Sequence, residues 1–306
     1  MNQQDQPALW KIVALLAIGM ITFGFAPILV RLAEDIHPVM LVAIRTVSAA
    51  LILLPFWLWN RYSWARDTTW SPKNNGKALL AGSFLGLHFI CWTASLFYTS
   101  VASASVLVTI HPVMLIIIES AFMRAKFPKM TWIGVLVAFA GSALLGLTDR
   151  DPSATYSDPV FGNILAFLAA LLFIGYILLS QGLRKEGTWL EFVFRVYAGT
   201  AIISVLAVVV FQIPWYAGVA GWVCGIALAI GPQIIGHGSV NYAVKFVPPT
   251  ILSTLILSEP IFATILAVLI FAEIPGVIQS AAMLIIITGV ITGWFGRMKR
   301  TKKFRK

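Results

Sequence analysis

Two polar residues, each followed by proline, interrupt long apolar stretches of this chain: His111-Pro112 and Glu259-Pro260. The stretches run over residues 101–127 and 247–273, which is long enough to cross a bilayer. A carboxyl group at mid-membrane costs at least ~2.5–3.5 kcal/mol, so an ionisable residue there indicates a functional or cavity-lining role. Proline also leaves the carbonyl four residues earlier without its helical partner, which another group must satisfy. The two dipeptides therefore predict one central site that binds a substrate or a proton.

Several roles remain open for these residues. Glu259 could bind a cationic group of a substrate, so that a zwitterionic or cationic metabolite would place its ammonium there. It could instead exchange a proton during transport or serve as a hydrogen-bonded structural carboxylic acid. His111 could point to the same axis as Glu259 or could be a hydrogen-bonded core residue. Glu119, nearer the end of its span, is as well suited to pair with a loop arginine as to line a cavity.

Two other apolar segments carry polar stripes. Gln233, His237 and Asn241 recur at intervals of four residues and so share one face of a helix. His88 and Trp92 lie on a comparable face of an earlier segment. Polar stripes in lipid should face protein or water, so these five side chains are predicted to line the cavity. The alternative is hydrogen bonding between helices, worth only about 0.6–2 kcal/mol per contact.

Arg45 and Arg195 lie about eight residues inside their apolar spans. Each could snorkel or form an ion pair, or its planar fork could recognise a substrate carboxylate. The sequence contains no convincing catalytic triad, zinc cluster, haem ligand set or phosphate-cradling Gly-Lys-Ser/Thr loop. We therefore predict no catalytic residue, no metal site and no cofactor.

The elements that must position these residues are transmembrane helices. The 306-residue chain is 59% hydrophobic and 11% charged, whereas a water-soluble domain carries roughly 25% charged residues. Runs of about 20 apolar residues without strict alternation favour helices over a β-barrel. The sequence thus predicts an all-α integral membrane protein. Its ten expected helices cover residues 11–33, 38–59, 77–99, 102–124, 130–148, 160–183, 189–212, 217–243, 248–272 and 276–297.

The distribution of basic residues sets the expected orientation. The formal net charge is +10, and most of the 22 lysines and arginines lie in alternate short loops and in the tail GRMKRTKKFRK. The positive-inside rule is then satisfied by an even number of spans with both termini in the cytoplasm. This placement indicates topology and contact with anionic lipid rather than nucleic-acid binding. We expect a multi-pass protein of the bacterial inner (plasma) membrane.

The intramembrane polar residues recur about 150 positions apart. The matched pairs are Arg45 with Arg195, His88 with His237, and His111 with Glu259. Five helices in each half is an odd number, so the second half enters from the opposite side, as in the inverted repeats of secondary transporters. The predicted organisation is a first repeat over residues 1–148, a periplasmic linker over 149–159, a second repeat over 160–297 and a basic cytoplasmic tail over 298–306.

Three stretches carry a family resemblance. They are ITFGFAPILVRLAED followed by HPVMLVAIRTVSAALILLP, then LHFICWTASLFYTSVASASVLVTIHPVM, and finally LSEPIFATILAVLIFAE. The chain resembles the EamA-type transporters of the drug/metabolite transporter superfamily, over nearly its whole length and as two five-helix repeats. The resemblance implies a carrier for amino acids or other small metabolites, in most relatives an exporter, without a bound cofactor.

The predicted function is a secondary transporter that moves an amino acid or related metabolite across the inner membrane by alternating access, with export as the expected direction. The partners are a small-molecule substrate, the lipid bilayer, and a proton or an exchanged metabolite as the coupling species. The sequence leaves open a lipid or lipid-linked sugar translocator, a membrane-embedded enzyme, and a receptor or scaffold without transport activity.

Overall fold

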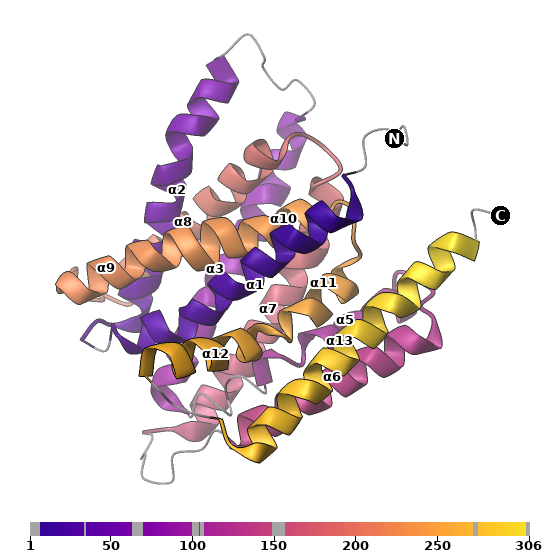
Figure 1. The fold of residues 1–306 in the computed structure, drawn as a ribbon. Helices are drawn as coiled ribbons and strands as arrows, with labels where there is room; N and C mark the ends of the chain where they lie inside the picture. Colours follow the sequence, from indigo (N-terminus) through magenta and orange to yellow (C-terminus); the bar gives the residue numbers. More distant parts are fainter. Residues whose placement is uncertain are drawn as a thin grey trace. The chain divides into compact units, whose positions relative to one another are not determined.

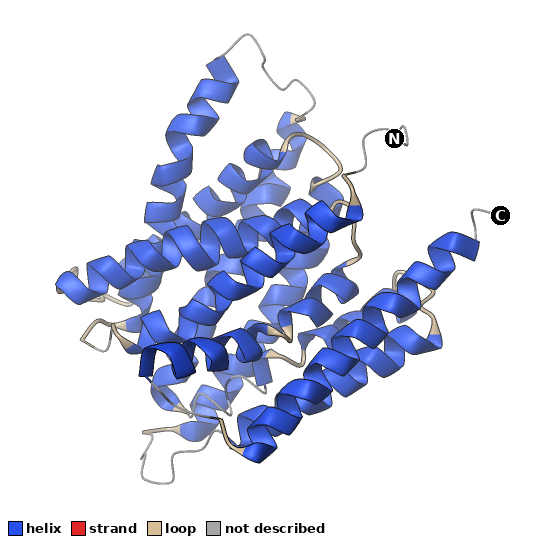
Figure 2. Ribbon diagram, viewed as in Figure 1, coloured by secondary structure: helices blue, strands red, loops and turns tan. Residues whose placement is uncertain are grey.

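The computed structural model describes residues 7–33, 35–62, 70–99, 104, 107–148, 157–271 and 275–303. In this part of the chain every regular element is a helix, and no strand occurs (Figure 2). The all-α prediction is therefore confirmed for these residues. The helices, labelled as in Figure 1, are α1 (Leu9–Arg31), α2 (Pro38–Tyr62), η2 (Pro72–Asn74), α3 (Asn75–Tyr98), α5 (His111–Ala121), α6 (Lys129–Thr148), α7 (Pro159–Leu183), α8 (Trp189–Val210), α9 (Val219–Leu228), η3 (Ala229–His237), α10 (Gly238–Ala243), α11 (Pro249–Ile256), α12 (Glu259–Phe271) and α13 (Val277–Lys303).

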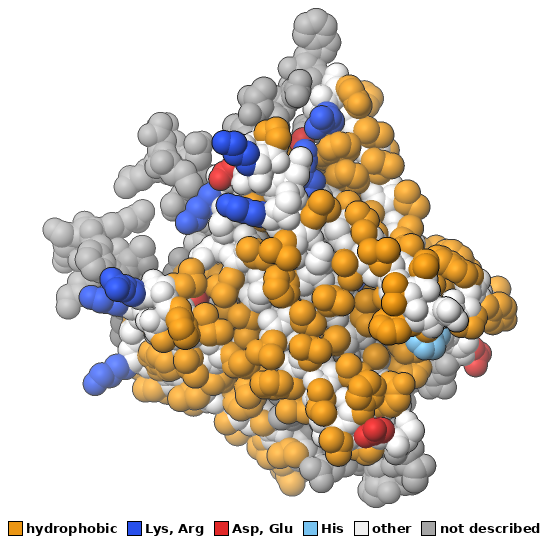
Figure 3. Space-filling model, turned by 180° about the vertical axis from the view of Figure 1, so that it is seen from behind, with side chains coloured by type: hydrophobic (Ala, Val, Ile, Leu, Met, Phe, Trp, Pro, Cys, Tyr) orange, Lys and Arg blue, Asp and Glu red, His pale blue; other side chains and the backbone are white. Residues whose placement is uncertain are grey.

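Seven helical segments of the described chain are long and apolar enough to cross a membrane. They are Trp10–Arg31, Pro38–Tyr62, Pro72–Tyr98, Pro159–Leu183, Trp189–Val210, Val219–Ala243 and Val277–Gly296. The other three expected spans coincide with α5, α6 and the pair α11 and α12, whose apolar helices are shorter. Hydrophobic side chains cover most of the face seen in Figure 3, as expected for a surface that contacts lipid.

The chain forms two compact units, and each unit draws on both halves of the sequence. Unit 1 comprises Met1–Thr93 and Gly175–Pro248, and unit 2 comprises Ala94–Ile174 and Pro249–Lys306. This division differs from the predicted repeats, which follow the order of the sequence. Residues 149–156 of the predicted linker and 304–306 of the predicted tail lie outside the described residues.

Unit 1 is held together by close contacts between α2, α3 and α8. α2 packs along α8, and the hydroxyls of Thr46 and Ser204 form a hydrogen bond of 2.5 Å between them. α3 approaches α8 at Gly82, where an added Cβ would lie 2.2 Å from the carbonyl oxygen of Val196. Small residues let helix backbones approach this closely, which matters in lipid because apolar burial no longer drives association.

Unit 2 contains an extensive pairing of α6 with α13, which run side by side in Figure 1. An added Cβ at Gly134 would lie 2.2 Å from the backbone nitrogen of Gly293, and one at Gly289 would lie 2.3 Å from that of Ala138. The glycines therefore allow two backbones to touch. In the same unit α5 packs against α11.

The two spans that carry the polar–proline dipeptides are broken, not continuous. Residues 109 and 110 form a turn before α5 begins at His111, and residues 257 and 258 form a turn before α12 begins at Glu259. Proline disfavours the helical conformation of the residue before it but fits the first turn of a helix. Among the described residues, the spans expected over 102–124 and 248–272 are therefore interrupted just before His111 and Glu259, each of which lies at the N-terminal end of a helix.

Candidate functional site

The polar stripe predicted within residues 217–243 lies on a helix with a π-helical segment. The span divides into α9, the π-helix η3 and α10 without a gap. Pro232 lies inside η3 and has no N–H to donate to the preceding turn. Gln233 and His237 belong to η3 and are 0% and 6% exposed, while Asn241 of α10 is 1% exposed. π-Helical turns occur frequently at functional sites, so this conformation favours a functional role for the three polar side chains.

Arg45 of α2 supplies the charge of the buried polar core in unit 1. The residue is only 2% exposed. Its Nε donates to Oε1 of Gln233 at 3.1 Å, and its Cζ lies 3.7 Å from the ring centroid of Phe89. An amide oxygen and an aromatic face both compensate a positive charge that has left water. Arg45 thus points into unit 1 and does not snorkel to the membrane surface.

His237 also belongs to this buried core, because its ring contacts Phe89. Its ring lies 5.0 Å from the Phe89 ring and 4.7 Å from the Phe23 ring, both in edge-on geometry. Arg45 and His88 also lie close to it. The structure therefore brings together Arg45, His88, Gln233 and His237, four of the residues that the sequence predicted for a site. Trp92 lies one turn beyond His88 on α3 and is partly buried.

Side chains of the α7–α8 region bond three backbone carbonyls of η3 and α10. The Tyr197 hydroxyl donates to the Gln233 carbonyl at 2.5 Å, Trp189 Nε1 to the Gly238 carbonyl at 2.9 Å, and Arg184 Nε to the Asn241 carbonyl at 2.8 Å. These contacts hold the π-helical span in place. The sequence analysis did not select Tyr197 or Arg184 for a site. The available signals were the position of Tyr197 inside an apolar span and of Arg184 at the end of one.

Among the described residues of unit 1, three buried donors around the π-helical span stand without a hydrogen-bond partner. They are Nε2 of Gln233, Nδ2 of Asn241 and Nη1 of Arg184. The Asn241 oxygen is already engaged, because it accepts from the Tyr176 hydroxyl at 2.5 Å. Each buried donor left without an acceptor costs about 1–3 kcal/mol. Groups that accept hydrogen bonds would be well suited to this region.

In unit 2, His111 satisfies the carbonyl that Pro112 leaves without a partner. Its Nδ1 lies 2.7 Å from the carbonyl oxygen of Val108, four residues before Pro112. A carbonyl only accepts, so Nδ1 carries the proton and Nε2 presents a lone pair. Nε2 has no partner, and the ring packs edge-on against Phe173 at 4.7 Å. His111 therefore has a structural contact and one available acceptor.

Two carboxylates of unit 2, Glu119 and Glu259, lie at the first turn of a helix. Glu119 is 3% exposed and accepts from the backbone nitrogen of Thr250 at 3.2 Å and from its hydroxyl, at the start of α11. It therefore ties the end of α5 to the start of α11. Glu259 is partly buried in the first turn of α12, where the helix dipole favours a negative charge.

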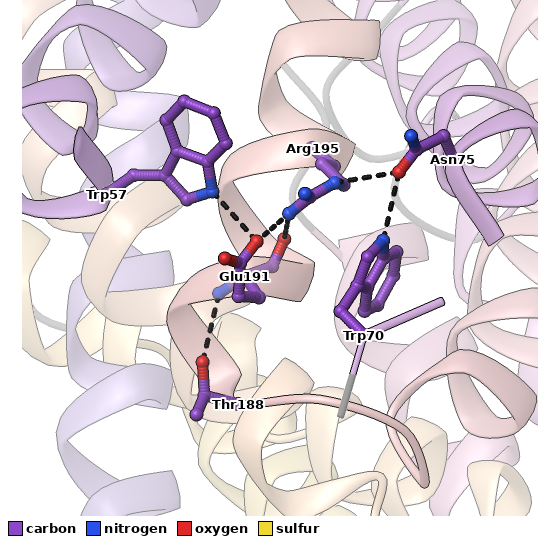
Figure 4. Close-up of polar contacts among 6 residues, drawn as sticks. All are labelled: Trp57, Trp70, Asn75, Thr188, Glu191 and Arg195. Atoms are coloured by element: carbon purple, nitrogen blue, oxygen red, sulfur yellow. Dashed lines mark hydrogen bonds and ion pairs between the residues drawn. The ribbon is translucent and has the colours of Figure 1, made fainter. Parts of the chain in front are cut away.

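Arg195 belongs to a separate polar cluster of unit 1, drawn in Figure 4. It forms an ion pair with Glu191, four residues earlier on α8, and its Nε donates to the Asn75 side chain at 2.9 Å. Trp57 donates to the same Glu191 carboxylate at 2.8 Å, and Trp70 donates to Asn75 at 2.9 Å. Of the roles that the sequence left open for Arg195, the structure contains the ion pair.

A helical chain with many long apolar segments and ionisable side chains buried among them is a multi-pass membrane protein. The model of the EamA-like transporter family matches residues 10–147 and 160–292. The chain therefore belongs to the EamA-like transporter family.

Two relatives from Bacillus subtilis (strain 168) are themselves named as transporters. The uncharacterized transporter YxxF is 22% identical over 250 residues, which covers 82% of this chain and 79% of YxxF. The uncharacterized transporter YdfC is 23% identical over 230 residues and covers 74% of each chain. One protein known from a crystal structure shares the fold, with a TM-score of 0.76 at 16% identity over 94% of this chain and 98% of that one.

Proposed function

We propose that this EamA-like transporter is a secondary carrier that moves a small organic metabolite, such as an amino acid, across the bacterial inner membrane by alternating access. Both termini lie in the cytoplasm and export is the direction of transport. The observation that carries the proposal is the polar core of unit 1, where Arg45, Gln233 and His237 meet at a π-helical segment inside apolar helices. Ionisable side chains inside membrane spans mark substrate and ion pathways.

Within unit 1, the substrate-binding residues of this proposal are His88, Trp92, Gln233, His237 and Asn241. The buried donors of Gln233 and Asn241 that have no partner support this role, because a substrate oxygen would satisfy them. Within unit 2, His111 and Glu259 are the proposed groups for a proton or a substrate ammonium. The available lone pair of His111 Nε2 supports that assignment.

We also propose that the two halves of the chain are inverted five-helix repeats. The support is that matched helices pack against each other inside each unit: α2 against α8, α5 against α11, and α6 against α13. Such pairs are expected when two repeats are related by a pseudo-twofold axis in the membrane plane.

Counterflow in proteoliposomes tests the carrier function. Vesicles are loaded with a panel of unlabelled amino acids and organic acids, and entry of each labelled compound is followed. We expect one chemical class to accumulate, and Gln233→Leu to lower its rate at least about tenfold, the effect of losing ~1.4 kcal/mol of binding or transition-state energy. Gln181→Leu makes the same change on the partly exposed face of α7 and should leave the rate unchanged.

Glu259→Gln and Glu259→Ala separate the roles of that carboxylate. A role of the charge in binding the substrate predicts that both variants lose counterflow, whereas a purely hydrogen-bonded role predicts activity in Glu259→Gln. Folded protein that accumulates no compound of the panel would contradict the proposed function, and so would a Gln233→Leu variant as fast as the wild type.

A further inference from the structure

Arg184 is a buried cation at the end of α7. The sequence assigns it to a short cytoplasmic loop next to Lys185, but its side chain is only 3% exposed, whereas Lys185 is exposed. Burial lowers the pKa of the Arg184 guanidinium to about 10, so the group keeps its charge at neutral pH. A charge removed from water in this way requires compensation.

The contacts of Arg184 compensate only part of that charge. Nε donates to the Asn241 carbonyl at 2.8 Å, and Cζ lies 5.7 Å from the ring centroid of Phe192. Nη1 has no hydrogen-bond partner, and no described residue forms an ion pair with Arg184. A neutral carbonyl and an aromatic ring leave the guanidinium without a counter-ion.

The carboxylates nearest in sequence are engaged elsewhere. Glu186 accepts a hydrogen bond from the side-chain amide of Asn74. Glu191 forms an ion pair with Arg195 and accepts from Trp57. The carboxylates of Glu186 and Glu191 therefore contact η2, α2 and α8 rather than Arg184.

A second donor without a partner lies at the residue that Arg184 contacts. Nδ2 of Asn241 is buried and has no partner, and its amide is oriented because Oδ1 accepts from the Tyr176 hydroxyl at 2.5 Å. The Arg184 guanidinium and the Asn241 side-chain amide thus each have one N–H donor without a partner, and the two residues are linked by the bond from Arg184 Nε to the Asn241 carbonyl. Both would be satisfied by a group that carries one negative charge and two acceptor oxygens.

We propose that Arg184 and Asn241 form a binding site for the carboxylate of a small molecule. A carboxylate fits better than a phosphate dianion, because the single cation balances one charge and the two oxygens can accept from Nη1 of Arg184 and Nδ2 of Asn241. The site rests on the proposed transport function for the role of that molecule as cargo. In the predicted orientation Arg184 lies at the cytoplasmic end of α7, so a carboxylate arriving from the cytoplasm would meet it.

Thermal unfolding of purified full-length protein in detergent tests the site. The probes are sodium acetate and sodium glutamate, with sodium chloride at equal ionic strength as the baseline and sodium phosphate as the competing anion. We expect a saturable rise in the apparent melting temperature on the order of 2–5 °C for at least one carboxylate. Lys185→Met is the matched control, because it removes the neighbouring exposed charge, and it should show the wild-type rise.

Two variants should abolish the rise for different reasons. Arg184→Met removes the cation and, without ligand, should melt near the wild-type temperature, because removing a buried charge without a counter-ion offsets the lost hydrogen bond to the Asn241 carbonyl. A purely structural Arg184 predicts a lower melting temperature in every salt. Asn241→Asp keeps the acceptor for Tyr176 and adds a carboxylate at the residue whose carbonyl Arg184 contacts, so in the proposed site it should raise the basal melting temperature and remove the response to added carboxylate.

The site is overturned if no carboxylate stabilises the wild type, if only phosphate does, or if Arg184→Met keeps the response, as a general salt effect would. The same variants in counterflow separate this inference from the carrier function. If a compound accumulates but no carboxylate stabilises the protein through Arg184, the carrier function is supported and the carboxylate site is overturned. If carboxylates stabilise the protein through Arg184 but no compound accumulates, the carboxylate site is supported and the carrier function is contradicted.

Discussion

The contact between His111 and Val108 gives a quantitative prediction about the break before α5. Pro112 has no N–H, so the Val108 carbonyl depends on Nδ1 of His111 at 2.7 Å. His111→Phe would keep a ring against Phe173 but remove the donor. A fully buried carbonyl left without a partner costs about 1–3 kcal/mol, and because Val108 is partly buried we expect this variant to lose about 1 kcal/mol of stability.

Pro112→Ala provides the informative background for this change. Alanine restores an N–H four residues after Val108, which can donate to the same carbonyl once the turn over residues 109 and 110 relaxes into a helix. His111→Phe should therefore cost much less in the Pro112→Ala background than in the wild-type chain. The expected coupling in the double-mutant cycle is about 1 kcal/mol, measured from reversible unfolding in detergent.

Equal costs in the two backgrounds, within about 0.3–0.5 kcal/mol, would refute the reasoning. The hydrogen bond of His111 would then not compensate for the N–H that Pro112 lacks. Counterflow on the same four proteins supplies the functional comparison. If the double variant recovers stability but not transport, the remaining Nε2 of the histidine has a separate role in the carrier.

Two further changes test the packing and the polar cluster of Figure 4. Gly134→Ala should lower stability by about 1–3 kcal/mol, because the added Cβ would lie 2.2 Å from the Gly293 nitrogen. At Gly182 an added Cβ would have nothing within 4 Å, so Gly182→Ala should leave the stability unchanged or raise it slightly. Glu191→Gln should cost on the order of 3 kcal/mol because it removes the carboxylate that forms the ion pair with Arg195, and less when combined with Arg195→Met. Equal melting temperatures for the single and double variants would contradict that ion-pair argument.

Much of the helical content was predictable because it depends on local composition. A run of about 20 apolar residues can satisfy its backbone in lipid only as a helix, so spans such as α1, α2, α7 and α8 follow from hydropathy. The same reasoning identified that Pro112 would leave a carbonyl without a partner. It did not identify His111 as that partner, because the contact needs a turn that hydropathy does not reveal.

The buried cations show where the prediction from sequence stopped. Arg195 bonds Glu191 at a spacing of four residues on one helix, a local pattern that the sequence contains. Arg184 is adjacent to Lys185 in a basic loop, and charge alone assigns both to the membrane surface. Burial of one and exposure of the other depends on how α7 and α10 meet.

The sequence by itself determined that the chain is helical, that it belongs in a membrane and that it resembles a transporter family, because these properties depend on composition and on short motifs. Only the tertiary structure decided that Arg45 bonds Gln233, 188 positions away, that a π-helical segment lies between α9 and α10, and that each unit combines both halves of the chain. The physical reason is that lipid-facing and protein-facing sides of these helices are both apolar. Hydropathy therefore defines the spans but not which faces pack together, and that choice depends on small-residue contacts and on buried hydrogen bonds.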